Sequence, residues 1–168
     1  MNDLGDPAGY KLAYEAGLKT LEEQANSLRE IRDRSGALLS VALLTGGLVA
    51  GLATLGSGSP SLKGAGYFGG VMVGVAVIGI AILTILAWRP PKGSASLDAA
   101  QIIGSYVEGD PALQQAELHR ELALHLSENS HTNSEELGMT RLLFRLGLGM
   151  MILEVSGVAM MLWEIANE

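Results

Sequence analysis

Residues 146–163 read LGLGMMILEVSGVAMMLW, and this apolar segment decides the fold. Together with the residues just before it, the segment is long enough to cross the hydrocarbon core of a bilayer as a helix. Glu154 lies near its middle, where a carboxylate costs about 3 kcal/mol on insertion scales. The side chain must therefore be protonated, paired or hydrated. No basic residue is expected at mid-membrane in this span or in the two others described below, so burial favours the neutral acid.

The composition of the chain excludes several classes of function. It has 168 residues, 48% of them hydrophobic, and no cysteine, which excludes a disulfide framework and a thiolate nucleophile. The formal net charge of −7 argues against nucleic acid as a partner. His119, His125 and His131 recur every six residues and do not share a helical face, so we interpret them as structural or solvated. With no nucleophile–base pair and no paired carboxylates, we predict no enzyme, no cofactor and no metal site.

Residues 10–35 are predicted to form an amphipathic helix, which we call the stalk. Its apolar positions are spaced alternately by four and three residues, which is typical of a short heptad seam. Such a seam favours packing against a partner helix. Its members after Tyr14 are Leu18, Leu21, Ala25 and Leu28.

The first span covers residues 36–55, which carry no charge over the length that a helix needs to cross hydrocarbon. No proline separates it from the stalk, so we expect one continuous helix. Gly47 and Gly51 form a Gly-xxx-Gly pair, which permits close approach of another helix. The Gly- and Ser-rich residues 56–65 indicate a turn.

The second span covers residues 66–88. It closes with Trp88 and Arg89, an aromatic and a basic residue of the kind that anchors a helix at a membrane interface. Its glycines recur at four-residue spacing and predict a second surface for tight helix contact. They are Gly66, Gly70 and Gly74.

Residues 89–139 form a polar insert, for which we predict a helix over Leu97–Glu108 and another over Pro111–Asn129. The segment Thr132–Glu135 has the spacing of a capping box, which predicts a new helix that becomes the third span, residues 140–163. A helix that runs on without a break is the alternative. The second insert helix has an apolar stripe that could meet the stalk, made of Leu118, Leu122 and Leu126.

The predicted fold is an all-α membrane protein with three transmembrane helices and cytoplasmic amphipathic helices. Its orientation follows from the arginines beside the span ends, since basic residues favour the cytoplasmic side. These are Arg29, Arg32, Arg34, Arg89, Arg141 and Arg145, whereas the other side has Lys63, Glu164 and Glu168. In chain order we expect a flexible lead (1–9), the cytoplasmic stalk (10–35), the first span (36–55), an external loop (56–65), the second span (66–88), the cytoplasmic insert (89–139), the third span (140–163) and an external tail (164–168).

The sequence leaves three roles open for Glu154. As a neutral acid it could hydrogen-bond across a helix interface and fix the packing. A ring of Glu154 side chains could instead line the pore of an oligomer and attract cations, or the group could exchange protons. Gly147 and Gly157 share its helical face and permit close helix approach. The hydroxyl side chains that we group with Glu154 in a candidate ion pathway are Thr45, Thr84 and Ser156.

Two functions are compatible with this layout. The first is an oligomeric membrane channel or pore-forming effector that favours cations through Glu154 and is gated by its cytoplasmic helices. The second is a membrane-anchored scaffold that recruits a partner through those helices, with Glu154 only a protonated packing residue. The expected partners are the lipid bilayer, further copies of the chain, and a cytoplasmic protein or a nucleotide signal. Replacing Glu154 by Gln or Leu separates the two functions, because only a channel needs the acid.

Two stretches carry a resemblance to known proteins. YEAGLKTLEEQ, from Tyr14 to Gln24, and LREIRDRSGALL, from Leu28 to Leu39, resemble uncharacterised small membrane proteins of actinobacteria. In layout the chain is similar to the SLATT and Pycsar-type membrane effectors of bacterial antiphage defence, which combine transmembrane and cytoplasmic helices. The resemblance implies a location in the bacterial inner membrane and a pore that opens on a nucleotide signal. Those families typically have two spans, whereas this chain has a third and no recognisable sensor domain for a cyclic nucleotide.

Overall fold

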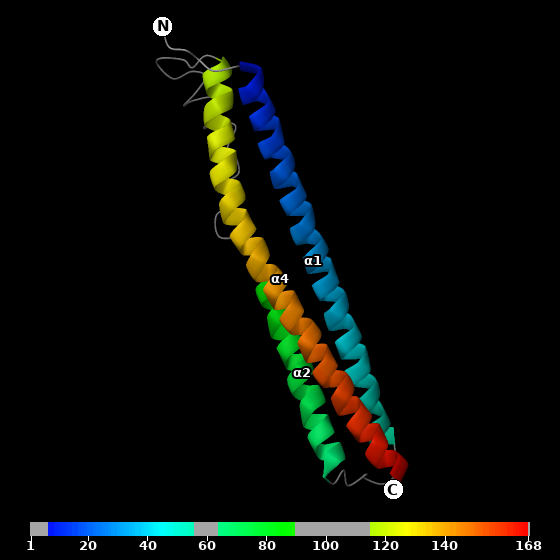
Figure 1. Cartoon of the computed structure of the whole chain (residues 1–168). Coiled ribbons are helices and arrows are strands. Elements are labelled where there is room, and N and C mark those ends of the chain that lie inside the picture. The colour runs from blue at the N-terminus through cyan, green and yellow to red at the C-terminus, as the bar shows by residue number, and fades with distance from the viewer. Residues whose placement is uncertain (1–6, 56–63, 90–114, 168) are drawn as a thin grey trace. The chain divides into compact units, whose positions relative to one another are not determined.

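The computed structural model describes residues 7–55, 64–89 and 115–167. Within these ranges all regular structure is helical, in the order α1 (Pro7–Leu55), α2 (Ala65–Ala87) and α4 (Gln115–Asn167) (Figure 1). Each of the three helices contains a stretch that is long and apolar enough to cross a membrane. This confirms the predicted all-helical class with three helices of spanning length.

The described residues fall into two compact units. Unit 1 contains residues 7–28 of α1 and 115–138 of α4, and unit 2 contains residues 29–55, 64–89 and 139–167. Helices α1 and α4 each contribute to both units, whereas α2 belongs to unit 2 alone.

Helix α1 is uninterrupted from Pro7 to Leu55, as the absence of an internal proline predicts. Three hydroxyl groups at and after residue 35 are satisfied on the helix itself, because each of them donates to the carbonyl oxygen four residues earlier. A helix of this kind needs no outside partner for its polar groups, which suits a lipid environment. The bonds run from Ser35 to Ile31 at 2.8 Å, from Ser40 to Gly36 at 3.0 Å and from Thr45 to Val41 at 3.0 Å.

Helix α4 is also continuous, from Gln115 to Asn167. The prediction that a new helix starts at Thr132 is therefore wrong, and the alternative of an unbroken helix is confirmed. The hydroxyl of Thr132 does not cap a helix start but donates to the carbonyl oxygen of Glu128 at 3.3 Å, one turn earlier. Neither glycine nor proline lies near Thr132, so nothing in the sequence stops the helix there. The insert helix predicted over residues 97–108 and most of the predicted loop 56–65 lie outside the described residues.

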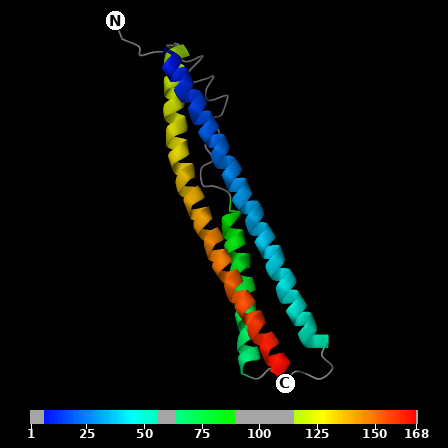
Figure 2. The same cartoon turned by 45° about the vertical axis from the view of Figure 1, so that its right-hand side comes forward.

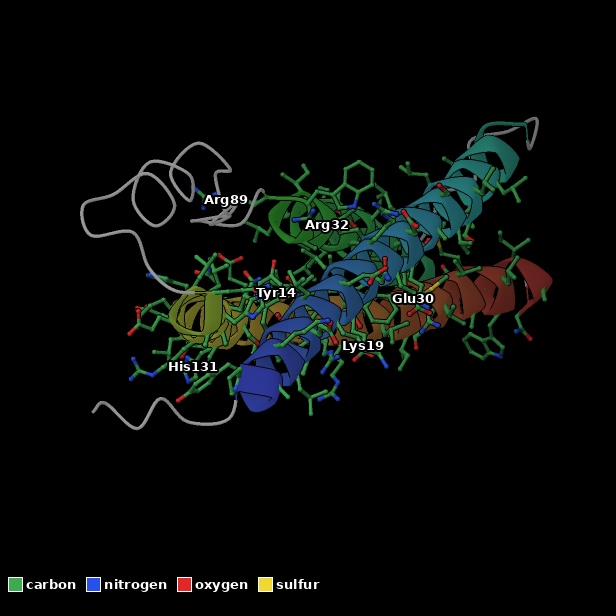
Figure 3. The ribbon with its side chains drawn as sticks, turned by 90° about the horizontal axis from the view of Figure 1, so that it is seen from above. Tyr14, Lys19, Glu30, Arg32, Arg89 and His131 are labelled. Atoms are coloured by element: carbon green, nitrogen blue, oxygen red, sulfur yellow. The ribbon has the colours of Figure 1, made fainter. Side chains whose placement is uncertain are left out.

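Unit 1 is a pair of helix segments held by polar and apolar contacts. The ring of Tyr14 in α1, labelled in Figure 3, stacks on that of His119 in α4, with the two centroids 5.7 Å apart. The side-chain nitrogen of Gln24 donates to the carbonyl oxygen of Ser130 at 3.1 Å and to its hydroxyl oxygen at 3.0 Å. Leu126 is fully buried. These contacts place the stalk portion of α1 against the portion of α4 that carries the predicted apolar stripe.

In unit 1, part of the face of α1 that contacts α4 is shifted by one residue from the predicted heptad seam. A Cβ atom added to Gly17 would be 3.1 Å from the side chain of Leu126, so the two helices approach closely at this glycine. Leu18 is 40% exposed and Ala25 is exposed, whereas their chain neighbours Gly17 and Gln24 contact α4. The spacing of apolar residues could not predict these two contacts, because Gly17 makes room for a leucine and Gln24 donates hydrogen bonds. The half-buried members of the predicted seam are Tyr14, Leu21 and Leu28.

In unit 2 the apolar parts of the three helices lie side by side, and α2 is antiparallel to α1 and α4 (Figures 1 and 2). The order of contacts gives the direction: Gly69 of α2 faces Gly157 of α4, whereas Gly79, farther along α2, contacts the earlier Met150 of α4. All three helices contribute to one apolar core. Its buried members are Leu38, Ala42 and Ile80, with Leu39, Val77, Phe144, Met150 and Met151 packed against them.

Both ends of α2 are capped by charged side chains from the other two helices. At its beginning, the carboxylate of Glu164 in α4 accepts a hydrogen bond from the backbone N–H of Gly66. At its end, Arg32 of α1 donates to the carbonyl oxygens of Ala87, at 3.2 Å, and Arg89, at 2.9 Å. A carboxylate at the amino end and a guanidinium at the carboxyl end both complement the helix dipole. The backbone of α2 is thus tied to each of its neighbours.

Candidate functional site

The closest helix contact in unit 2 sets the position of α4 on α2. A Cβ atom added to Gly69 would lie 2.5 Å from the carbonyl oxygen of Gly157, and one added to Gly157 would lie 2.6 Å from the carbonyl oxygen of Gly69. Only residues without side chains permit this approach, which is the usual means of tight helix association in membranes. The next residues on that face of α4 are therefore held firmly against the neighbouring helices.

Glu154 lies one turn from Gly157 on the same face of α4 and is only 1% exposed. It lies between the contact of Gly157 with Gly69 and that of Met150 with Gly79. At 1.5 Å per residue this places it at the level of about residues 72–75 of α2. The side chain is thus enclosed within unit 2 and does not face outward.

The carboxyl group of Glu154 has no hydrogen-bond partner among the described residues. Both of its side-chain oxygens are buried and unbonded. A buried polar group without a partner costs about 1–3 kcal/mol, and a charged one costs more. The interpretation of Glu154 as a residue that fixes packing by a hydrogen bond therefore lacks the bond it requires.

The hydroxyl groups that we grouped with Glu154 in a candidate ion pathway are not gathered around it. Each donates instead to a backbone carbonyl oxygen. Ser156 lies on the exposed side of α4, and Thr84 is buried at the contact with α1 near the carboxyl end of α2. A pathway through all four residues would require the helices to rearrange. The bonds run from Thr45 to Val41 at 3.0 Å, from Ser156 to Ile152 at 2.8 Å and from Thr84 to Ser35 at 3.5 Å.

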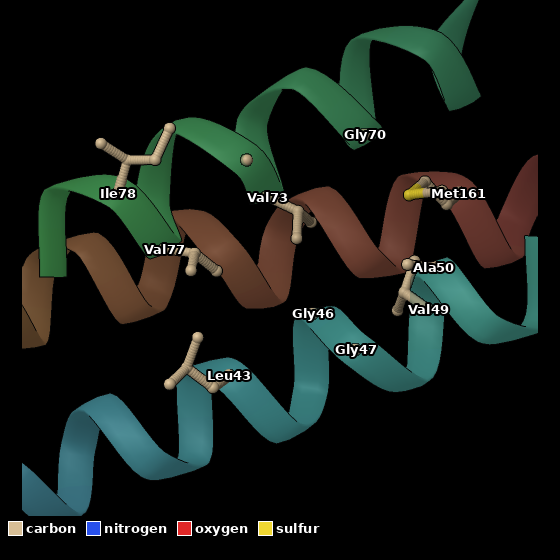
Figure 4. Close-up of a pocket in the computed structure, with 11 residues that line it drawn as sticks. Leu43, Gly46, Gly47, Val49, Ala50, Gly70, Val73, Val77, Ile78 and Met161 are labelled. Carbon is tan, nitrogen blue, oxygen red and sulfur yellow. The ribbon is translucent and has the colours of Figure 1, made fainter. Parts of the chain in front are cut away.

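A groove of about 520 Å³ opens between α1 and α2 in unit 2 (Figure 4). Apolar side chains and glycines line it, among them Leu43 of α1 and Met161 of α4. Beside it α1 touches α2 at Gly46, where an added Cβ would lie 3.3 Å from Val77 and 3.8 Å from Val73. At this level, Val73 and Val77 of α2 therefore contact Gly46 of α1, and the groove lies beside this contact.

The glycines predicted to form close-packing surfaces differ in what they contact. Gly147 and Gly157 of α4 contact neighbouring helices, and Gly66, the first glycine of the α2 repeat, is buried. A Cβ atom added to Gly147 would lie 3.5 Å from the side chain of Leu38, and one added to Gly157 would meet the backbone of Gly69. By contrast, the other glycines of the two repeats lie in or near the groove. An added Cβ would meet nothing within 4 Å at Gly47, Gly51 and Gly74, and only the end of Met161 at Gly70.

Several structurally important residues were not singled out from the sequence. Gly69 falls outside the four-residue glycine repeat of α2, yet it makes the closest contact. Arg32 and Glu164 were interpreted only as markers of orientation, although they cap α2. One signal could have indicated a cap from elsewhere in the chain, because α2 begins after Gly64 without a Ser, Thr, Asp or Asn to bond its first amides.

Comparison of the chain with protein-family models, with curated proteins and with solved structures found no match. The class is therefore defined by the chain's own features: it is an all-helical protein with three helices of membrane-spanning length and composition. Within that class, the enclosed carboxyl of Glu154 and the groove between α1 and α2 are the features that bear on function.

Proposed function

We propose that the protein is a homo-oligomeric membrane channel or pore-forming effector that favours cations through Glu154. The observation that carries the proposal is the burial of Glu154 without a hydrogen-bond partner in the described part of the chain. A purely structural position gains nothing from such a group, since an apolar side chain of similar size would fill it at lower cost. A carboxylate that meets permeating cations does require the acid.

The enclosed position of Glu154 corresponds to a closed state in this proposal. Opening requires the helices around the carboxyl to part. Hydrogen bonds of Arg32, Thr84 and Trp88 hold α1 to α2 at one end of unit 2, but beside the groove α1 meets α2 through valines on Gly46. By contrast, α2 and α4 are joined by the backbone contact of Gly69 with Gly157. In this proposal, water reaches Glu154 when the helices part beside the groove, and the face that carries Glu154 is then offered to another copy of the chain.

Gating by the cytoplasmic helices follows from the continuity of α1. The same helix contributes residues 7–28 to unit 1 and residues 29–55 to unit 2 without a break. A cytoplasmic protein or a nucleotide that binds unit 1 would then act on α1 directly. We place the protein in the bacterial inner membrane with its N-terminus in the cytoplasm and its C-terminus outside, because the arginines of unit 2 lie on the N-terminal side of the first and third spans.

Cation flux from vesicles that contain the purified chain tests the proposal. The wild type is expected to release a trapped cation, and Glu154→Gln, which keeps the shape and removes the charge, is expected to slow release at least tenfold. Ser156→Ala is the matched control, since Ser156 is two residues away on the exposed side of α4 and its hydroxyl donates to Ile152 of its own helix. Equal flux from wild type and Glu154→Gln, or a monomer as the only species in nanodiscs, would exclude the channel.

The membrane-anchored scaffold is the second candidate, and one observation favours it. Glu154 is enclosed by the helices of its own chain, as a residue that only fills space would be. A scaffold would show no flux in the vesicle assay, and its partner binding through unit 1 would be unchanged in Glu154→Gln and Glu154→Leu.

A further inference from the structure

One end of unit 2 carries six arginines from all three helices, which we call the arginine belt. Helix contacts put them within about 10 Å of one another along the helix axes. Arg32 of α1 bonds to the carbonyl oxygen of Arg89, which follows α2. Gly147 of α4 contacts Leu38 of the parallel α1. Because α1 and α4 are parallel, residues that precede Leu38 and Gly147 by the same number of positions lie at the same level. Arg141 of α4 therefore lies level with Arg32 of α1. The belt consists of Arg29, Arg32, Arg34, Arg89, Arg141 and Arg145.

The belt divides into arginines that are engaged within the chain and arginines that are not. Arg32 donates to backbone carbonyls, and Arg34 forms an ion pair with Glu30 at 2.5 Å. The other carboxylates near this level are those of Asp33 in α1 and of Glu135 and Glu136 in α4, five to six residues before Arg141. The six guanidinium groups of the belt thus outnumber the carboxylates around them. The four that form no ion pair or hydrogen bond within the described residues are Arg29, Arg89, Arg141 and Arg145.

The position of the belt is that of a lipid headgroup layer. Trp88 lies at the same level, is 57% exposed, and donates from its indole nitrogen to the carbonyl oxygen of Arg32 at 3.2 Å. Tryptophans with a polar end satisfied and a ring exposed are typical of membrane interfaces. At the opposite end of unit 2, the described residues include Glu164 but no lysine or arginine. Among the residues that the structure describes, the two ends of the spans therefore carry opposite charge.

We propose that the arginine belt binds the phosphates of anionic phospholipid headgroups, with Arg29, Arg89, Arg141 and Arg145 as its ligands. A guanidinium presents a planar fork of donors that matches phosphate oxygens. Basic residues beside a span are attracted to anionic lipid by about 1 kcal/mol each, which corresponds to about fivefold in lipid retention for each arginine. The belt would fix the depth of all three helices in one leaflet, and it does so whether or not the protein conducts ions.

Native mass spectrometry of the protein released from nanodiscs tests this proposal. With equal amounts of phosphatidylglycerol and phosphatidylcholine, the wild type is expected to retain mainly phosphatidylglycerol. The variants Arg29→Gln/Arg89→Gln and Arg141→Gln/Arg145→Gln should each reduce that preference by about 25-fold, if the fivefold effect per arginine multiplies. Arg34→Gln is the matched control and should leave it unchanged, because Arg34 is already paired with Glu30.

Three outcomes would overturn the proposal. Equal retention of the two lipids by the wild type would show that the belt does not select anionic headgroups. A loss in Arg34→Gln as large as that in Arg29→Gln/Arg89→Gln would show an effect of net charge alone. Displacement of bound lipid by inorganic phosphate or by a nucleotide at low concentration would assign the arginines to a soluble phosphate ligand. For any variant that does not fold, retention by the wild type at increasing salt concentration is the second measurement, and it is expected to fall.

Discussion

Gly69 of α2 and Gly157 of α4 face each other so closely that each glycine's missing side chain would collide with the other's carbonyl oxygen. The contact is reciprocal, at 2.5 Å in one direction and 2.6 Å in the other. Because both obstacles are backbone atoms, neither can turn aside as a flexible side chain could. This pair therefore fixes the distance between the two helices next to Glu154.

Replacement of Gly157 by alanine is expected to destabilise unit 2 by about 1–3 kcal/mol, since the helices must separate to admit the methyl group. The loss exceeds the ~1 kcal/mol that alanine gains over glycine in a helix. Unfolding in mixed detergent micelles measures the change. Gly74→Ala is the matched control, because an added Cβ there meets nothing within 4 Å. If Gly157→Ala proves as stable as Gly74→Ala, the close contact does not form.

Replacement of Glu154 by methionine is expected to raise the free energy of unfolding by about 1–3 kcal/mol, because it removes a buried polar group that has no partner. The same variant should lose cation flux. Glu164→Met, in the same helix, is expected to change stability in the opposite direction, because the carboxylate of Glu164 accepts a hydrogen bond from Gly66. A destabilised Glu154→Met would mean that the acid has a bonded partner in the membrane.

Replacement of Arg32 by methionine is expected to destabilise unit 2 by about 1–3 kcal/mol, since it leaves the last carbonyl groups of α2 without their charged donor. Arg34→Met removes a guanidinium two residues away, which pairs with the exposed Glu30 and with no other carboxylate among the described residues. Its effect should therefore stay within about 0.5 kcal/mol. The same unfolding experiment compares the two. Equal effects would mean that Arg32 does not cap α2.

In unit 1, Gln24→Leu is expected to loosen the contact between α1 and α4, because both hydrogen bonds to Ser130 are lost at about 1 kcal/mol each. Hydrogen–deuterium exchange should then become faster over residues 7–28 and 115–138. Glu23→Leu changes the exposed neighbouring residue and should leave exchange as it is. Unchanged exchange in Gln24→Leu would place the stability of unit 1 in its apolar contacts alone.

The helices could be predicted from the sequence because length, hydropathy and the absence of proline are local properties. They were sufficient for the unbroken α1 and for all three spanning lengths. The capping-box pattern at Thr132 gave a wrong prediction, because the threonine hydroxyl can also donate to a carbonyl oxygen one turn earlier inside a helix. A four-residue pattern cannot distinguish these cases when no glycine or proline ends the preceding helix.

The details of the site depend on which helix faces meet, and no single stretch of sequence encodes that. Glu154 was recognisable as the decisive residue from its depth in an apolar run. Its separation from Ser156 was less apparent, although two residues along a helix differ by about 200°. The choice of Gly69 over Gly70 as the contact glycine depends on the register of α2 against α4, which becomes visible only once both helices are packed.

The caps at the two ends of α2 have a consequence for biogenesis. The cap at its carboxyl end comes from Arg32, which the ribosome has already made when α2 emerges. The cap at its amino end comes from Glu164, which is synthesised 98 residues after the amide of Gly66 that it binds. When the second helix has been synthesised, the partner for its carboxyl end is thus already present, whereas the partner for its amino end is supplied only by the later synthesis of α4.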